Sequence, residues 1–270
     1  MVKYSLLKKE RGESMARMIV VTSGKGGVGK TTVSAFLGAC LSAKGERVVL
    51  CDADFGLNNA DVVCGVEKSV LYDVVDVIEG RCRAKQALIR HPKFYNLFIL
   101  ASRTSTPERF IAPQALKLVL DGLSPEFDYI IIDSPAGIDE GFHRAACSAN
   151  EAIVVTTPHV AAIRDADKAI ALLKSYGMQS VSLVVNMVQG DLIVTGDMIS
   201  PKEIAEVLKT PLIGVIPADY YLPFADLKTP HKAFKALAET VRTGKRKLYD
   251  TTGKYTGFFG SVRRALKRSL

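Results

Sequence analysis

A glycine-rich stretch near the start of the chain constrains the fold more than any other feature. Residues 24–31 read Gly-x-x-x-x-Gly-Lys-Thr, with an apolar, β-branched run before them and a helical pattern after them. Glycines let backbone N–H groups approach an anion without a Cβ in the way, and the free N–H groups of the following helix attract negative charge. A strand, a glycine loop and a helix in this order predict a phosphate-binding P-loop.

The side chains that close the motif suit a nucleoside phosphate with its metal ion. Lys30 provides a positive charge for the β- and γ-phosphates, and the hydroxyl of Thr31 can ligate Mg²⁺. A plain P-loop has no use for a second lysine at Lys25, which on its own would be a solvated loop residue. The predicted nucleotide-binding residues of this stretch are Gly24, Gly26, Gly27, Val28, Gly29, Lys30 and Thr31.

Strand and helix patterns alternate along the chain. The predicted strands are Met18–Ser23, Val48–Cys51, Leu97–Ala101, Tyr129–Ile132, Ala152–Thr156, Val181–Val185 and Leu212–Ile216, and the predicted helices include Lys30–Lys44, Tyr72–Glu79 and Ala115–Gly122. Because the strands are apolar on both faces and separated by helices, they favour an α/β fold with three layers: a mainly parallel twisted sheet with helices on both faces. In such a sheet, ligands bind beyond the carboxyl ends of the strands.

Three aspartates follow two of the apolar strands. Asp52 and Asp54 come after the second strand, and Asp133 follows the strand at 129–132. In P-loop proteins a carboxylate at such a position holds the Mg²⁺ shell or positions the attacking water. An N-cap or a turn is the alternative role for an aspartate here. We predict that Thr31 and Asp133 hold the metal ion, whereas one of Asp52 and Asp54 can position or polarise water and the other can hold a magnesium-bound water.

Composition narrows the class of protein further. The chain has 270 residues and is 48% hydrophobic, which suffices for one large domain with a substantial core. Its five cysteines are scattered without a Cys-x-x-Cys pattern, which disfavours a disulfide framework or a zinc site and indicates a reducing compartment. No apolar run approaches the ~20 residues of a membrane span, and the start lacks the apolar core of a secretory signal. We expect a cytoplasmic protein.

The net charge of +8 is concentrated in the C-terminal tail. Residues 242–270 contain nine Lys or Arg residues and one Asp, whereas the rest of the chain contains 27 basic and 27 acidic residues. A generally basic DNA-binding surface would not be distributed in this way, so no specific nucleic acid is expected as a partner.

The end of this tail has the pattern of an amphipathic basic helix. Apolar residues recur about every four positions, and four cations lie on the other side. A free chain end of this kind indicates an anchor that lies in the plane of an anionic membrane surface, the alternative being a helix docked on the body. The predicted membrane-contacting residues are Phe258, Phe259, Val262, Leu266 and Leu270, together with Arg263, Arg264, Lys267 and Arg268.

These patterns divide the chain into four parts. Residues 1–14 are polar and basic, and we interpret them as a disordered or non-native extension. Residues 15–242 form the predicted P-loop domain. Residues 243–257 are polar, basic and glycine-containing and are expected to be a flexible linker. Residues 258–270 are the predicted membrane-targeting helix.

The motifs resemble those of the MinD/ParA family of ATPases. The segment Lys25–Thr32 is similar to the deviant Walker A motif of that family, which has an extra lysine where this chain has Lys25. The resemblance is also carried by Asp52–Asp61, Tyr72–Gly80, Phe127–Asp139, Ala152–Pro158, Arg164–Asp167, Gly196–Met198 and Gly214–Pro217. The chain departs from the family pattern at Asn58 and Met187, where arginine is usual, and across residues 220–241.

The resemblance implies roles for single side chains. Lys25 would reach the phosphates of the partner subunit in an ATP-bound homodimer, and Asp54 would position water; these two are the predicted catalytic residues. Lys30, Thr31 and Thr32 would bind the nucleotide and magnesium within one subunit, and Asp52 and Asp133 would support the magnesium shell. The implied adenine contacts are Asn186, Pro217 and Asp219, and the implied contacts with partner proteins are Asn59, Asp165 and Asp167.

The resemblance also implies a function, with ATP and Mg²⁺ as cofactors. It implies an ATPase that dimerises with ATP and binds reversibly to the inner face of the cytoplasmic membrane. This ATPase would position the division septum by recruiting a division inhibitor similar to MinC, would respond to a topological regulator such as MinE, and would leave the membrane on hydrolysis. One alternative is a homologue that sets flagellar number or polar placement. A ParA-type DNA-partitioning ATPase is another.

Overall fold

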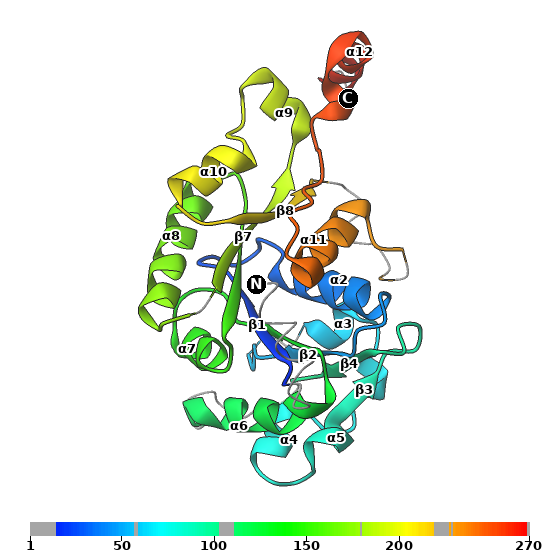
Figure 1. The fold of residues 1–270 in the computed structure, drawn as a ribbon, viewed down its shortest axis with the longest axis vertical. Coiled ribbons are helices and arrows are strands. Elements are labelled where there is room, and N and C mark those ends of the chain that lie inside the picture. Colours follow the sequence, from blue (N-terminus) through cyan, green and yellow to red (C-terminus); the bar gives the residue numbers. More distant parts are fainter. Residues whose placement is uncertain are drawn as a thin grey trace.

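A single mixed sheet forms the centre of the molecule. The computed structural model describes residues 15–56, 59–102, 111–178, 180–218, 227 and 229–268 (Figure 1). Its strands are β1 (Arg17–Thr22), β2 (Val48–Asp52), β3 (Leu88–Arg90), β4 (Leu97–Leu100), β5 (Tyr129–Asp133), β6 (Glu151–Thr156), β7 (Ser180–Val188) and β8 (Leu212–Pro217). They follow the order β3-β4-β2-β5-β1-β6-β7-β8. All neighbours are parallel except β3 and β4.

The α/β prediction is confirmed, and the seven predicted strands are present with ends that shift by up to three residues. Strand β3 is absent from the prediction. It has three residues, follows a one-turn helix and pairs antiparallel with β4, so its segment is too short to show a period of two. The helix predicted at Lys30–Lys44 ends at Ser42, and the one predicted at Tyr72–Glu79 begins at Val74.

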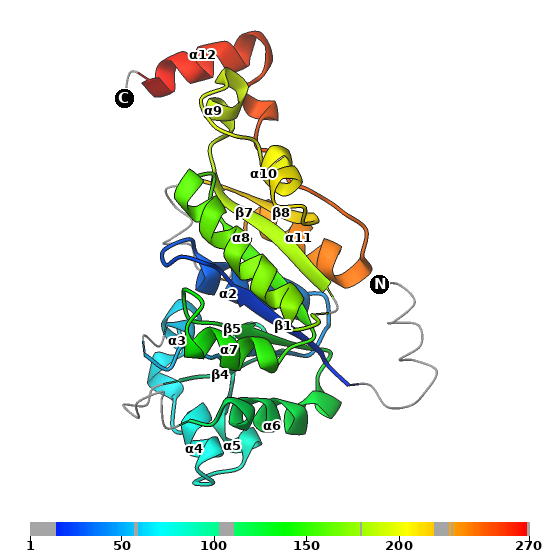
Figure 2. The ribbon, with the colours of Figure 1, turned by 90° about the vertical axis from the view of Figure 1, so that its left-hand side faces the viewer.

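Helices cover both faces of the sheet. They are α2 (Lys30–Ser42), α3 (Ala60–Val63), α4 (Val74–Ile78), α5 (Ala84–Ala87), α6 (Pro113–Leu123), α7 (Glu140–Cys147), α8 (Val160–Ser175), α9 (Gly190–Thr195), α10 (Pro201–Val207), α11 (Lys232–Thr243) and α12 (Gly257–Arg268). Helices α2, α3 and α11 pack on one face, and α4 to α8 and α10 pack on the other (Figures 1 and 2). On the first face the rings of Phe36 and Phe234 stack with centroids 4.5 Å apart, which joins α2 to α11.

The strand order places a topological switch point at β1. The chain runs from β1 to β2 on one side, and β6 joins on the other side of β1. The connections that leave the carboxyl ends of β1 and its neighbours therefore diverge there and leave room for a ligand between them. The loop from Ser23 to Gly29 leaves β1 at this point and enters α2.

The C-terminal tail crosses α9 before it forms α12. We call residues 245–256 the C-terminal strap; it includes a 3₁₀ turn at Gly253–Tyr255 that contacts both α9 and α12. Thr251 and Tyr255 are buried, although they lie in the stretch predicted to be a flexible linker. Helix α12 projects at one end of the molecule beside α9 (Figure 2). No helix among the described residues is long and apolar enough to cross a membrane. The domain boundaries themselves stay a prediction.

Candidate functional site

The P-loop has the backbone that its glycines predict. Gly29 adopts a φ of 87°, in the left-handed region, and is the residue from which α2 begins. Val28 and Lys30 are buried, whereas Lys25, Gly26 and Gly27 are exposed. Gly24 lies against α8 so closely that a Cβ there would stand 2.1 Å from the carbonyl oxygen of Asp165. The first glycine of the motif is therefore required by packing.

Asn186 supports the loop from a distant strand. It lies near the end of β7, is buried, and its Nδ2 donates a 2.8 Å hydrogen bond to the carbonyl oxygen of Val28. A Cβ on Gly29 would stand 2.4 Å from the same Nδ2. Met187 follows in a left-handed conformation with φ of 56°. The predicted adenine contact of Asn186 stays a prediction, and its observed role is to hold the P-loop backbone.

Lys30 and Asp133 come together on facing elements. Asp133 ends β5 and is buried, and Ser34 of α2 donates a 2.9 Å hydrogen bond to its Oδ1. Burial raises the pKa of Asp133 to about 6, against hydrogen bonds from Thr31 and Ser34 and the charge of Lys30, which lower it. Burial lowers the pKa of Lys30, whereas the nearby carboxylates of Asp133 and Asp54 raise it.

Asp52 has a structural role that one of the two sequence interpretations anticipated. Its Oδ2 accepts hydrogen bonds of 3.0 Å from the backbone N–H groups of Asn59 and Ala60, and its Oδ1 accepts one of 3.0 Å from Asp54. The carboxylate thus holds the start of α3 beside the P-loop edge. Burial and the neighbouring Asp133 raise the pKa of Asp52 to about 8, against the backbone hydrogen bonds from Ala60 and Asp54.

The residues at this edge fit a magnesium ion. Asp52 and Asp133 are paired across adjacent strands, and both have pKa values raised by burial. A divalent cation would relieve that accumulation of negative charge. Among the described residues no group of three His, Cys, Asp or Glu side chains forms a metal cage. Mg²⁺ in nucleotide sites takes one or two carboxylates and completes its shell with phosphates and water. Thr31 and Asp133 would hold it, and Asp52 lies next to Asp133 on the neighbouring strand.

The other predicted contact residues are spread more widely. Asp54 is half-buried beside the P-loop edge, and Asn59 is exposed at the start of α3. Asp165 and Asp167 lie on α8, where Asp165 pairs with Lys168 at 3.3 Å. Pro217 is buried at the end of β8. Asp219 and Leu270 lie outside the described residues, as do the side chains of Arg263, Leu266, Lys267 and Arg268.

On the terminal helix the described side chains divide into two groups. Phe258 and Phe259 are 80% and 86% exposed, and Val262 is 47% exposed. Arg264 instead turns back toward the body: its Nη1 donates to the carbonyl oxygen of Tyr255 and its Nη2 donates to Ser261 at 3.0 Å. The guanidinium of Arg264 ties the first turns of α12 to the strap, and its predicted membrane contact stays a prediction.

The sequence prediction omits Ser34, and it omits the contact between Gly24 and Asp165, two residues that were predicted for separate roles. Ser34 has a detectable signal, since it follows Thr31 by three residues and so lies on the same side of α2. The close approach of Gly24 to Asp165 has none, because the two residues are 141 positions apart and meet only through the packing of α8 on the sheet.

The fold and this edge define a P-loop nucleotide hydrolase: a glycine loop after β1 at the switch point, a buried lysine at the start of α2, and an aspartate at the end of a neighbouring strand. Comparison with known proteins gives the same class of protein. Residues 16–181 match the family model described as an AAA domain. The chain is 46% identical over 207 residues to the septum site-determining protein MinD of Bacillus subtilis, covering 76% of this chain and 77% of that protein.

Solved structures give the same result. The MinD cell division protein of Aquifex aeolicus superposes with a TM-score of 0.78 at 34% identity, over 87% of this chain and all of that one. A MinD of Pyrococcus horikoshii solved with Mg-ADP has a TM-score of 0.75 at 31% identity, over 84% of this chain and 96% of that one. The chain belongs to the MinD family of septum site-determining ATPases.

Proposed function

We propose that this protein places the division septum by binding ATP at the P-loop edge, dimerising, and associating with the membrane until hydrolysis releases it. The observation that carries the proposal is the meeting of Lys30, Asp133 and Asp54 beside the glycine loop in a chain of the MinD family. The relative from Pyrococcus horikoshii that was solved with Mg-ADP supports ATP and Mg²⁺ as the cofactors.

The roles of the side chains follow from their positions. Lys30 is held at the start of α2, where its ammonium neutralises the β- and γ-phosphates. Asp54 lies at the same edge and orients the attacking water. Mg²⁺, when bound by Thr31 and Asp133, neutralises charge that develops on the phosphates. Lys25 is exposed at the tip of the loop, free to reach the phosphates held by a second subunit.

The membrane step rests on the exposed apolar end of α12. Phe258 and Phe259 present large apolar surfaces, each worth about 1.5–3 kcal/mol on full burial. Ordering the helix opposes this gain, since each backbone residue costs about 1–2 kcal/mol. One tail therefore binds marginally, whereas two tails joined in an ATP dimer gain roughly 10²–10⁴ in avidity. Dimerisation by ATP becomes the membrane switch.

Sedimentation with anionic liposomes tests this step. Phe259→Glu should abolish ATP-dependent binding, as should deletion of residues 258–270, while ATP binding survives. Leu118→Glu on α6 is the matched control, because Leu118 is also exposed, at 72%, and lies far from the tail. Equal sedimentation of the wild type and Phe259→Glu would contradict the proposal.

The partner proteins are proposed from the family. A relative from Aquifex aeolicus was solved as a MinC:MinD complex, at a TM-score of 0.77 and 35% identity. A division inhibitor similar to MinC, and a regulator similar to MinE, would use α8 with Asp165 and Asp167. The Asp54→Ala protein, trapped as an ATP dimer, should retain such an inhibitor in a pull-down. Recovery of flagellar or polar machinery instead would favour the alternative, a homologue that sets flagellar number or polar placement. The divergence across residues 220–241 is the observation that supports this alternative.

A further inference from the structure

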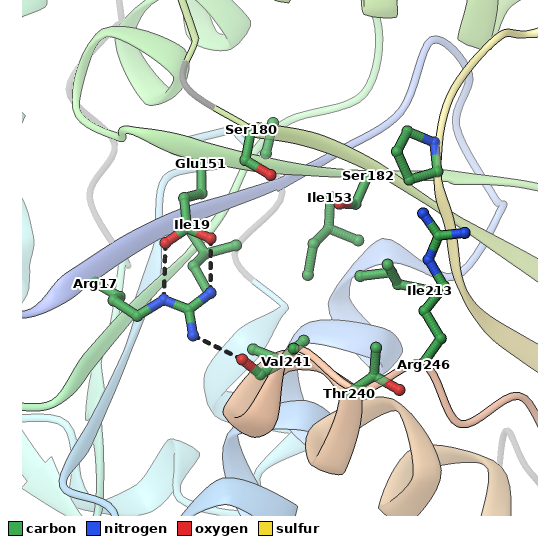
Figure 3. Close-up of a pocket in the computed structure, with 13 residues that line it drawn as sticks. Arg17, Ile19, Glu151, Ile153, Ser180, Ser182, Ile213, Thr240, Val241 and Arg246 are labelled. Carbon is green, nitrogen blue, oxygen red and sulfur yellow. Dashed lines mark hydrogen bonds and ion pairs between the residues drawn. The ribbon is translucent and has the colours of Figure 1, made fainter. Parts of the chain in front are cut away.

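A second pocket lies at the edge of the sheet opposite the P-loop. It is bounded by the first residues of β1, β6 and β7, by the segment before β8, and by the end of α11 (Figure 3). Because the strands run parallel, their amino ends are as far from the nucleotide site as the sheet allows. The pocket has a volume of about 180 Å³. The nucleotide chemistry described above uses none of its residues.

On one side of the pocket the charged side chains are already paired with each other. Arg17 donates two 2.7 Å hydrogen bonds to the carboxylate oxygens of Glu151, through Nε and Nη2. Its Nη1 donates a third, of 2.6 Å, to the carbonyl oxygen of Val241 near the end of α11. The dashed lines in Figure 3 mark these contacts. Arg17 and Glu151 therefore neutralise one another and tie α11 to the sheet, and neither needs a ligand.

The other side has polar groups that no described residue engages. Arg246 lies exposed at the mouth of the pocket and makes no hydrogen bond or ion pair within the part of the chain that the structure describes. Ser182 is 6% exposed and lines the pocket, and its hydroxyl also lacks a bond to any described residue. In Figure 3, Arg17 and Arg246 lie on opposite sides of the pocket. The uncompensated charge of the pocket is thus one positive guanidinium.

Between these two sides the walls are apolar. Ile19 and Ile153 are buried core residues, and Ile213 extends the apolar surface toward Arg246 (Figure 3). An engineered apolar cavity of about 150 Å³ accepts benzene. The volume here therefore suits one ring or a short branched chain, with a polar end at the mouth.

We propose that this pocket binds a small amphipathic monocarboxylate, with its apolar body over Ile19 and Ile153 and its carboxylate at Arg246 and Ser182. A guanidinium matches a carboxylate with two parallel hydrogen bonds. A dianion such as a phosphate monoester is disfavoured, because Arg246 supplies only one uncompensated positive charge and the negative end of the α11 dipole lies in the same pocket. Such a ligand would join the sheet to the start of the C-terminal strap.

Titration of the full-length protein with benzoate, followed by NMR chemical-shift changes or calorimetry, tests the proposal. Saturable binding is expected, and Arg246→Gln should weaken it about tenfold or more, as the loss of one charge-assisted pair predicts. Lys245→Gln is the matched control, since Lys245 is an exposed neighbour that does not line the pocket. Benzyl alcohol, a neutral probe of similar size, should bind more weakly than benzoate.

Three outcomes would overturn the inference: no saturable binding of benzoate, equal binding by the wild type and Arg246→Gln, or equal losses in Arg246→Gln and Lys245→Gln. ATP binding, measured in the same samples, separates this result from the proposed function. It should be unchanged in both variants, because the P-loop lies at the other edge of the sheet. Ser182→Ala provides a second variant, which removes the pocket hydroxyl without introducing a larger side chain.

Discussion

The contact between α9 and the C-terminal strap can be tested with one methyl group. Gly190 is the first residue of α9, and a Cβ placed there would stand 1.8 Å from the carbonyl oxygen of Thr251. Real Cβ contacts essentially never fall below 3.0 Å, so the strap backbone must retreat by at least 1.2 Å. The position of a Cβ is fixed by the backbone and its partner is a backbone carbonyl, so no side-chain rotation relieves the clash. We therefore expect Gly190→Ala to detach the strap from α9.

The size of the effect follows from overpacking. Such clashes cost about 1–3 kcal/mol, which corresponds to a roughly 5- to 150-fold rise in the detached population of the strap. Trypsin reports this population directly, because Arg246, Lys247 and Lys254 lie in the strap. When opening is fast relative to cleavage, the cleavage rate scales with the open fraction. Cleavage in the strap should accelerate by that factor while the sheet stays protected, and hydrogen exchange should rise at the same residues.

Gly122→Ala is the matched control for this experiment. Gly122 lies in the last turn of α6, where a Cβ would meet nothing within 4 Å. Alanine there should be neutral or stabilise the helix by up to about 1 kcal/mol. Equal rates of strap cleavage in Gly190→Ala and Gly122→Ala would contradict the predicted clash. Loss of protection in the sheet of Gly190→Ala, together with the strap, would also contradict it.

Three further predictions concern the body of the protein. Asp133→Asn should flatten the pH dependence of stability in the absence of nucleotide and metal. Because the pKa of Asp133 rises from 3.8 to about 6 on folding, the wild type should lose stability, on the order of 2–3 kcal/mol, as the pH rises from about 4 to above 6. Urea melts across that range measure the loss, and an equal loss in the variant would contradict the prediction. Asn186→Ala removes the 2.8 Å bond to Val28 and should lower ATP affinity about 5- to 10-fold by calorimetry with little change in Tm, whereas unchanged affinity would show that the P-loop needs no such support. Phe234→Ala leaves a cavity against Phe36 and should cost about 3–5 kcal/mol in chemical denaturation, and a cost below 1 kcal/mol would contradict the stacking of α11 on α2.

Most of the nucleotide-binding edge of the sheet could be predicted, because the residues that identify it lie close together in the sequence. A glycine loop followed by Lys30 can be read without knowing any other part of the chain, and so can the apolar run that ends at Asp133. Parallel strands place their carboxyl ends at one edge, which brings those local signals together in any sheet of this kind. The amphipathic repeat of α12 is local in the same way, and the structure contains that helix at Gly257–Arg268.

Contacts between distant segments were decided only by the tertiary structure. Strand order sets which segments meet, and the sequence carries no period that encodes it. Asp52 holds α3, Asn186 holds the P-loop, and Gly190 accepts the strap because β2, β7 and the tail occupy particular places. The pocket beneath α11 arises in the same way.

The sequence by itself therefore determined the α/β class, the phosphate loop and the amphipathic character of the chain end, because each follows from patterns among residues that are close together in the chain. The tertiary structure decided which backbone each carboxylate and amide engages, that Arg264 turns toward Tyr255, and that Arg246 is left without a partner among the described residues. Those outcomes depend on close packing between segments that are far apart in the chain, such as Val28 and Asn186, which are separated by 158 positions.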